Sequence, residues 1–337
     1  MKIALDAMGG DKAPLVNIEG ARKALALYPK IEKIFLVGDE EILKAECEKN
    51  KLTDPRAVIV HASQVVEMHE SGAKTLRSKR DSSISVAAGL VKDGDADALV
   101  SAGNTGAAVA AATLKLRTLK GVDRAGIASP MPNEHGICSL LDAGANPEAK
   151  PEHLVVYAVM GAMFAKHVYG VENPVVGLMS NGEEDEKGTA FTKQTFELLK
   201  DWDEAPFTFK GNVEGSDIFE TKLDVVLTDG FTGNIILKTC EATAKAMSKW
   251  MKLEFKRSPL RTLGAAMAKG AFKALKKRSS YEYYGGSPLL GINGVVIISH
   301  GGSSSLAMQN AIRGAMEAVE QEVNPHIEEA LAKLGFE

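Results

Sequence analysis

The sequence has few cysteines and almost no net charge, and each feature excludes a class of protein. Cys47, Cys138 and Cys240 lie far apart and form no C-x-x-C pair, so neither a disulfide framework nor a zinc site is indicated. The 40 Lys and Arg residues nearly balance the 44 Asp and Glu residues, which leaves a net charge of −4. This balance argues against a general nucleic-acid-binding protein, and a polyanionic partner would need a local patch.

Long apolar runs are also missing. Asp6 interrupts the N-terminus before any run long enough for a signal peptide, so we expect a cytoplasmic protein. The apolar stretch at 154–165 is too short to cross a bilayer, and the stretch at 98–114 is interrupted by the turn at 103–106. We therefore expect no transmembrane helix.

The usual nucleotide and hydrolase motifs are absent. The sequence contains no G-x-G-x-x-G and no G-x-x-x-x-G-K-[ST], which disfavours an enzyme that binds a dinucleotide or ATP. It also contains no H-E-x-x-H and no G-x-S-x-G, so zinc proteolysis and α/β-hydrolase chemistry lack their usual marks. We expect no cofactor and no metal.

What is present is the composition of a globular α/β protein. The 337 residues are 45% hydrophobic and 25% charged. Short Val, Ile and Leu runs alternate with Gly-containing turns and helical stretches, which predicts βα units and a largely parallel sheet. We expect one large α/β domain over residues 1–337. The six clearest predicted strands are 2–7, 34–37, 98–101, 175–179, 225–228 and 295–299.

The turns after these strands combine glycine with small polar residues. Helix N-termini in such turns favour anions, because their N–H groups are unpaired and carry the positive end of the helix dipole. For any single turn, ordinary helix capping is the favoured explanation, so the inference of an anion site depends on several turns meeting at one carboxyl edge. Lys187 is the best candidate for charge stabilisation, and the alternative is a solvated lysine after an acidic turn.

Several blocks of sequence resemble one known family. They are Asp6-Ala7-Met8-Gly9-Gly10-Asp11, Ser101-Ala102-Gly103-Asn104-Thr105-Gly106-Ala107, Leu141-Asp142-Ala143-Gly144-Ala145-Asn146, Gly182-Glu183-Glu184 with Lys187-Gly188, Asp229-Gly230-Phe231-Thr232-Gly233-Asn234, Leu289-Leu290-Gly291 and Ser299-His300-Gly301. In this order, and over residues 1 to about 320, the chain resembles the bacterial phosphate acyltransferases of phospholipid synthesis, the PlsX family.

This resemblance implies an enzyme that transfers a long acyl chain from acyl carrier protein to inorganic phosphate, giving acyl phosphate. It also implies a homodimer that is cytoplasmic and peripherally associated with the inner face of the membrane. The implied fold is a Rossmann-like α/β/α sandwich, similar to that of phosphotransacetylases and isocitrate dehydrogenases. The implied catalytic residues are Lys187, Asn104, Asp229, Asn234 and Asp142. The implied phosphate- or substrate-binding residues are Gly9, Gly10, Asp11, Gly103, Thr105, Gly106, Asn146, Asn181, Gly230, Thr232, Gly233 and His300.

The chemistry agrees with these residue types. Phosphate is already an anionic nucleophile at neutral pH and a thiolate is a good leaving group, so positioning and oxyanion stabilisation could suffice. We expect helix N-termini and Lys187 to hold the phosphate, and Asn104 or Asn234 to donate to the thioester oxygen. A covalent acyl-cysteine on Cys138 or Cys240 is a weaker alternative. Two other functions stay open: an acyl-CoA:phosphate acyltransferase and a non-catalytic membrane scaffold.

A basic segment covers residues 252–278 and contains one acidic residue, Glu254. As a helix it would place Leu260, Leu263 and Met267 on one side and its cations on the other, which is typical of a helix lying on an anionic membrane. A helix packed on its own domain or on a dimer partner is an alternative. A third alternative is docking of acyl carrier protein, for which Lys74, Arg77, Lys79 and Arg80 form a competing patch.

Overall fold

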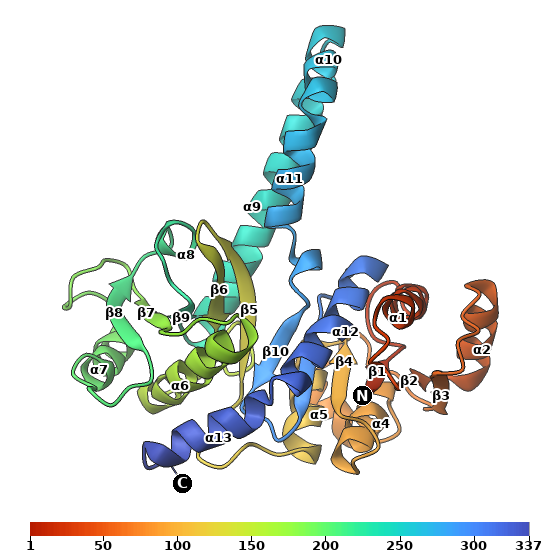
Figure 1. The fold of residues 1–337 in the computed structure, drawn as a ribbon, viewed down its shortest axis with the longest axis horizontal. Coiled ribbons are helices and arrows are strands. Elements are labelled where there is room, and N and C mark those ends of the chain that lie inside the picture. The colour runs from red at the N-terminus through yellow and green to blue at the C-terminus, as the bar shows by residue number, and fades with distance from the viewer. Residues whose placement is uncertain (337) are drawn as a thin grey trace.

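The computed structural model describes residues 1–336 and forms one sheet covered by helices on both faces, with a helical projection (Figure 1). The 11 strands follow the order β3-β2-β1-β4-β11-β10-β5-β6-β9-β7-β8. They are β1 (Lys2–Asp6), β2 (Lys33–Gly38), β3 (Ala57–His61), β4 (Ala98–Ser101), β5 (Gly126–Asn133), β6 (Gly136–Leu141), β7 (Val175–Met179), β8 (Thr208–Val213), β9 (Val225–Leu227), β10 (Ser287–Leu290) and β11 (Val295–Ile298).

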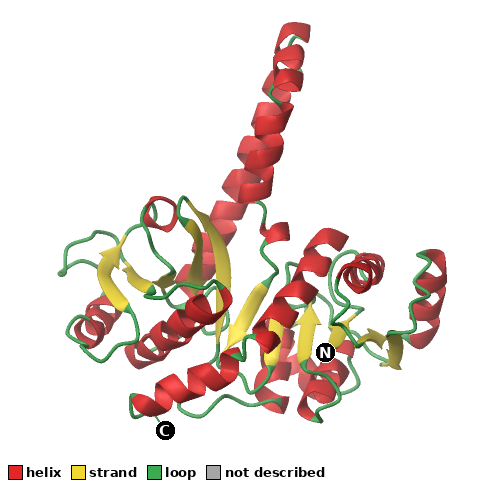
Figure 2. Cartoon of the chain, in the orientation of Figure 1, coloured by secondary structure: helices red, strands yellow, loops and turns green. Residues whose placement is uncertain are grey.

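Helices fill most of the connections between strands, as the α/β rhythm predicts (Figure 2). They are α1 (Leu15–Leu27), α2 (Glu40–Lys49), α3 (Gly72–Ser78), α4 (Ser83–Lys92), α5 (Thr105–Lys115), α6 (Pro151–Val168), α7 (Ala190–Leu199), α8 (Asp217–Glu220), α9 (Gly230–Phe255), α10 (Pro259–Met267), α11 (Lys269–Ser279), the 3-10 helix η1 (Tyr281–Tyr283), α12 (Ser305–Glu320) and α13 (Val323–Lys333). The six predicted strands are confirmed as β1, β2, β4, β7, β9 and β11, and no end differs by more than one residue.

Alternate residues of the strands pack into cores on opposite faces of the sheet. In β4, Leu99 joins the core under α4 and α5, whereas Val100 joins the core under α1 and α12. In β9, Leu227 packs with α6 and Val226 packs on the face that α9 covers. This alternation follows from the two-residue period of a strand, and burial on both faces explains why these short segments are mostly apolar.

The direction of the strands changes in the middle of the sheet. Most neighbouring strands are parallel, but β11–β10, β10–β5 and β5–β6 are antiparallel. Three reversals make β6, β9, β7 and β8 run opposite to β1, β4 and β11. The expectation that all the turns open at one carboxyl edge is therefore wrong: the turns after β1, β4 and β11 lie at one edge, and those after β6, β9 and β7 lie at the other.

A helical projection rises from the sheet (Figure 1). Its outgoing arm is α9, and α10 and α11 form the tip and the return arm. The basic segment 252–278 is thus divided among three helices, because Ser258 and Pro259 start a new helix in which Ser258 Oγ accepts a hydrogen bond from Arg261 N. No helix within residues 1–336 is both long and apolar enough to span a bilayer. We propose that the chain forms one α/β domain from which this projection extends.

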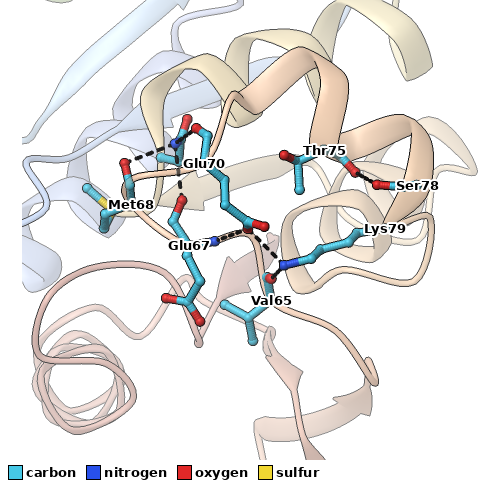
Figure 3. Close-up of polar contacts among 8 residues, drawn as sticks. Val65, Glu67, Met68, Glu70, Thr75, Ser78 and Lys79 are labelled. Atoms are coloured by element: carbon cyan, nitrogen blue, oxygen red, sulfur yellow. Dashed lines mark hydrogen bonds and ion pairs between the residues drawn. The ribbon is translucent and has the colours of Figure 1, made fainter.

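The segment between β3 and α4, residues 64–79, lies against the start of α5; we call it the strap segment. Asn104, the N-cap of α5, donates from Nδ2 to the backbone oxygens of Glu67, Met68 and Glu70 at 3.2, 3.2 and 2.8 Å. Within the strap, Lys79 Nζ donates to Val65 O and to Glu70 Oε2, both at 2.8 Å (Figure 3). The Asn104 side chain thus holds the strap segment over the turn at residues 101–106, the SAGNTG turn.

The start of α9 packs against the turn after β6 so closely that only glycine fits. A Cβ on Gly233 would lie 2.0 Å from the backbone oxygen of Asp142, and a Cβ on Gly230 would lie 2.6 Å from Asp142 Oδ2. Two glycines of the DGFTGN motif therefore serve the approach of the α9 backbone to the sheet.

We predict that Asn104→Ala loosens the strap segment. The substitution removes three hydrogen bonds to the strap and the cap of α5, which alone contributes about 1 kcal/mol. Amide hydrogen exchange in residues 64–79 should become at least tenfold faster when measured by mass spectrometry. Ser78→Ala is the control, because Ser78 Oγ donates only to Thr75 O within the strap. Unchanged exchange in Asn104→Ala would contradict the anchoring role.

We further predict that Gly233→Ala lowers the free energy of unfolding by about 1–3 kcal/mol, the usual cost of overpacking. Urea denaturation measures the change. The control is Gly264→Ala in α10, where an added Cβ meets nothing within 4 Å and where alanine favours the helix. If both variants are as stable as the wild type, the α9 contact is looser than described.

Candidate functional site

A large cavity lies between α9, β5, the chain that returns from α11 to β10, and the turns after β4 and β11. Its volume is ≈ 930 Å³, within the range of ligand-binding pockets. Thr105, Gly106, Gly144, Asn234 and His300 all line it. The cavity therefore joins side chains from both edges of the sheet, although the turns that carry them point in opposite directions.

Asp142 organises the turn after β6. Its carboxylate is buried and accepts four backbone hydrogen bonds, from Ile127, Gly144 and Ala145 at 2.9 Å and from Asn146 at 2.6 Å. Burial raises the pKa of Asp142, and the four N–H donors act against that rise. Because all four donors are backbone groups of the protein itself, the Asp142 carboxylate shapes the turn at residues 141–146, the LDAGAN turn.

Asp229 has a similar role at the start of α9. Its carboxylate accepts hydrogen bonds from Phe231 N, Thr232 N and Thr232 Oγ1, while Gly230 N donates to Asn146 O. Gly233 N makes the first helical bond, to Asp229 O. The N–H groups of Gly230, Phe231, Thr232 and Gly233 are thus all used, and a carboxylate already occupies this helix N-terminus. An anion would be repelled there.

Asn146 links the LDAGAN turn to helix α6. Its Nδ2 lies 3.3 Å from both His153 Nδ1 and the hydroxyl oxygen of Tyr157. Tyr157 is buried and donates to the backbone oxygen of Ala125 at 3.1 Å. Burial raises the pKa of Tyr157, so this hydroxyl stays protonated at neutral pH. The Asn146 side chain therefore holds the turn in place.

The start of α5 differs from the start of α9 because it retains unpaired donors. Asn104 Oδ1 accepts from Ala107 N, but the N–H groups of Thr105 and Gly106 have no hydrogen-bond partner within residues 1–336. In the same part of the chain, the Thr105 hydroxyl and the Asn234 carboxamide are also unpaired. Thr105, Gly106 and Asn234 line the cavity, where an anionic or carbonyl-containing ligand could use these donors.

The turns after β1, β4 and β11 pack tightly together beside this helix start. Ser101 Oγ donates to the buried Asp6 Oδ2 at 2.7 Å and accepts from Gly103 N at 3.0 Å. A Cβ on Gly9 would lie 2.7 Å from Gly103 N, so the two turns touch through glycines. Burial raises the pKa of Asp6. Gly9, Gly10 and Gly103 therefore act in packing.

A row of charged residues on α9 faces the turn after β11. His300 Nε2 lies 3.5 Å from Glu241 Oε2, and Lys238 Nζ lies 3.4 Å from the same oxygen. Burial lowers the pKa of His300, and Lys238 lowers it further. His300 Nδ1 accepts from Gly302 N, and the backbone of Asp11 donates to Gly301 O. Lys238, Glu241 and Lys245 also line the cavity. The sequence did not indicate them as site residues, because their spacing is that of an ordinary solvated helix face.

Lys187 and Asn181 lie in the turn after β7 and are not among the described residues that line the cavity. The Lys187 side chain is 48% exposed and its ammonium is 4.0 Å from Glu184 Oε1. Asn181 Oδ1 accepts from Gly188 N, which closes the turn. The reversal of strand direction separates this turn from the start of α5.

The cysteines and potential metal ligands offer no obvious nucleophile or metal centre. Burial raises the pKa of Cys138 and Cys240, so both are thiols at neutral pH, and only Cys240 lines the cavity. Residues 1–336 contain no cluster of three or more His, Cys, Asp or Glu side chains arranged to hold a metal ion.

Known structures share the fold. The chain superposes on a phosphotransacetylase from Streptococcus pyogenes with a TM-score of 0.60, at 18% identity, covering 95% of this chain and 94% of the other. A branched-chain phosphotransacylase from Enterococcus faecalis gives a TM-score of 0.60 at 15% identity, covering 95% and 99%. The predicted Rossmann-like α/β/α fold, similar to that of phosphotransacetylases, is confirmed.

Sequence relatives are much closer. A phosphate acyltransferase from Akkermansia muciniphila is 61% identical over 99% of this chain and 97% of its own length. One from Pelotomaculum thermopropionicum is 48% identical, covering 99% and 96%. The family model described as "Fatty acid synthesis protein" matches residues 1–326. The chain therefore belongs to this fatty acid synthesis protein family, which confirms the resemblance to the bacterial phosphate acyltransferases seen in the sequence.

Proposed function

We propose that this protein transfers a long acyl chain from acyl carrier protein to inorganic phosphate and releases acyl phosphate for phospholipid synthesis. The observation that carries the proposal is the single cavity that joins the unpaired donors of Thr105, Gly106 and Asn234 to a long apolar wall. The relatives from Akkermansia muciniphila and Pelotomaculum thermopropionicum, both named phosphate acyltransferase, support the same chemistry.

The phosphate binds at the start of α5 in this proposal. The backbone N–H groups of Thr105 and Gly106 and the Thr105 hydroxyl are available to donate hydrogen bonds to a phosphate oxygen. The helix dipole favours a negative charge at the same place. Lys238 and Lys245 on α9 add positive charge to the same cavity. The start of α9 is unsuited to this role because Asp229 occupies it.

The thioester carbonyl faces Asn234. Of the two asparagines expected from the sequence, Asn104 already donates to three strap carbonyls, so the oxyanion donor is Asn234. A phosphate oxygen attacks the carbonyl carbon, the oxyanion forms against the amide, and the carrier thiolate leaves as the carbonyl re-forms. Asp142 and Asp229 position these groups through the turns they organise. The proposal for Lys187 rests on the family resemblance alone.

We also propose a cytoplasmic homodimer that attaches peripherally to the inner face of the membrane through the tip of the projection. Leu260, Leu263 and Met267 on α10 are 79%, 59% and 83% exposed. Arg257 and Arg261 lie beside them and pair with Glu254. Exposed apolar side chains flanked by cations suit an anionic lipid surface.

The function predicts phosphate-dependent release of free thiol from acyl carrier protein carrying a palmitoyl group. The wild type should release thiol with phosphate and none when sulfate replaces it, and Asn234→Ala should lower kcat/KM by about 10²–10³, the usual cost of losing an oxyanion donor. The palmitoyl-CoA thioester is assayed in parallel. Faster turnover on CoA would favour an acyl-CoA:phosphate acyltransferase, and no thiol release from either substrate would favour a scaffold.

The membrane contact predicts that Leu263→Glu with Met267→Glu weakens binding to vesicles containing anionic lipid at least tenfold, because burying one such side chain contributes about 1.5–3 kcal/mol. Vesicle co-sedimentation measures this. The matched control is Leu27→Glu with Leu114→Glu, which changes two side chains of 59% and 60% exposure outside the projection. Equal binding by both double variants would refute attachment through the tip.

A further inference from the structure

One face of α9 carries an apolar row that continues beyond the reacting groups. Leu237, Cys240, Ala244 and Met247 follow one another at steps of three, four and three residues, so they share one face of the helix. All four line the cavity. The charged row Lys238, Glu241 and Lys245 is displaced by one residue and therefore lies on the neighbouring face, beside His300.

Strand β5 and helix α8 form the opposite wall of this apolar row. Ile127, Met131 and Pro132 of β5 and Phe219 of α8 line the cavity. Phe219 is fixed at the far end of β5, because its backbone oxygen accepts a hydrogen bond from Glu134 N at 2.8 Å. The near end of β5 is fixed at the site, because Ile127 N donates to Asp142 Oδ1. The two walls together define a channel, which we call the α9–β5 channel.

The channel begins at a polar group. Asn234 lies three residues before Leu237 on the same helix face, and a Cβ on Gly144 would be 3.1 Å from its Nδ2. The turn after β6 thus presses against the Asn234 amide and leaves it at the mouth of the apolar row. This is the arrangement that a carbonyl followed by a hydrocarbon chain requires.

The two walls give similar lengths for the channel. From Asn234 to Met247, α9 advances about 20 Å, because a helix rises about 1.5 Å per residue. From Ile127 to Pro132, β5 advances about 17 Å at about 3.4 Å per residue. An extended chain gains about 1.2 Å per bond, as the peptide backbone does, so the channel holds about 15 carbons.

We propose that the α9–β5 channel binds the acyl chain of the substrate, with the thioester at Asn234 and the methyl end between Phe219 and Met247. The proposal rests on the proposed function and adds to it the residues that set chain length. Cys240, Ala244 and Met247 lie at increasing distances from the carbonyl, so bulk at each of them should exclude chains above a different length.

The test is a tryptophan series at these positions, assayed as phosphate-dependent thiol release from acyl carrier protein carrying octanoyl, decanoyl or palmitoyl groups. Position 244 lies about 15 Å along α9 from Asn234, so tryptophan there should displace the last few carbons of palmitate. Each displaced methylene costs about fourfold in binding. Ala244→Trp should therefore lower the palmitoyl-to-octanoyl ratio of kcat/KM at least tenfold.

The order of the series tests the direction of the chain. Cys240→Trp should lower the decanoyl-to-octanoyl ratio as well, whereas Ala244→Trp should leave that ratio near the wild-type value. Met247→Trp should have the smallest effect on palmitate. The reverse order would overturn the placement of the thioester at Asn234.

Ala242→Trp is the matched control, because Ala242 is an exposed alanine of the same helix that does not line the cavity. Its ratios should equal those of the wild type. If Ala244→Trp leaves the palmitoyl-to-octanoyl ratio unchanged, or if Ala242→Trp lowers it equally, the acyl chain does not bind in the α9–β5 channel. The proposed function would stand in either case. A wild type that releases no thiol with any chain length would instead refute the proposed function.

Discussion

The cavity depends on the three antiparallel pairings that join β11, β10, β5 and β6. In an open parallel sheet, ligands collect at one edge, outside the carboxyl ends of the strands. Here the second half of the sheet is inverted, so helix α5 starts at one edge and helix α9 starts at the other. Both helices lie over the same face, and α9 therefore runs from Gly144 past His300. That path along one face lets residues from opposite edges line one cavity.

The starts of α5 and α9 differ in the charge of the side chains that pair with their N–H groups. Asp142 accepts hydrogen bonds from three N–H groups of its own turn and from Ile127 N of β5, and Asp229 accepts those of Phe231 and Thr232 at the start of α9. The second half of the sheet therefore supplies a rigid frame whose N–H groups are already paired with carboxylates. The cap of α5 is a neutral amide, and Asn104 leaves the N–H groups of Thr105 and Gly106 unpaired. The charge of the capping side chain thus decides which helix start attracts an anion.

Local sequence was sufficient to predict the central strands but insufficient to predict their direction. Strands such as β4 and β7 are almost entirely apolar because both of their faces are covered, and this pattern is visible in the sequence. Strand β5 contains Pro130 and Pro132, and β10 contains Pro288 among its 4 residues, so neither has a recognisable strand pattern. Without these two strands the reversal is invisible. Similarly, Asn104, Asp142 and Asp229 stand out as polar residues in glycine-rich turns, whereas Lys238 and Glu241 resemble any exposed helix surface.

Helix α9 is continuous from Gly230 to Phe255, and after Gly233 it contains neither glycine nor proline. Such a helix has no built-in hinge, since sharp bends arise mainly at those residues. It therefore behaves as a stiff rod of about 39 Å, at about 1.5 Å per residue. The distance from Asn234 to the tip of the projection, and so to any surface that the tip contacts, is therefore set by the length of α9.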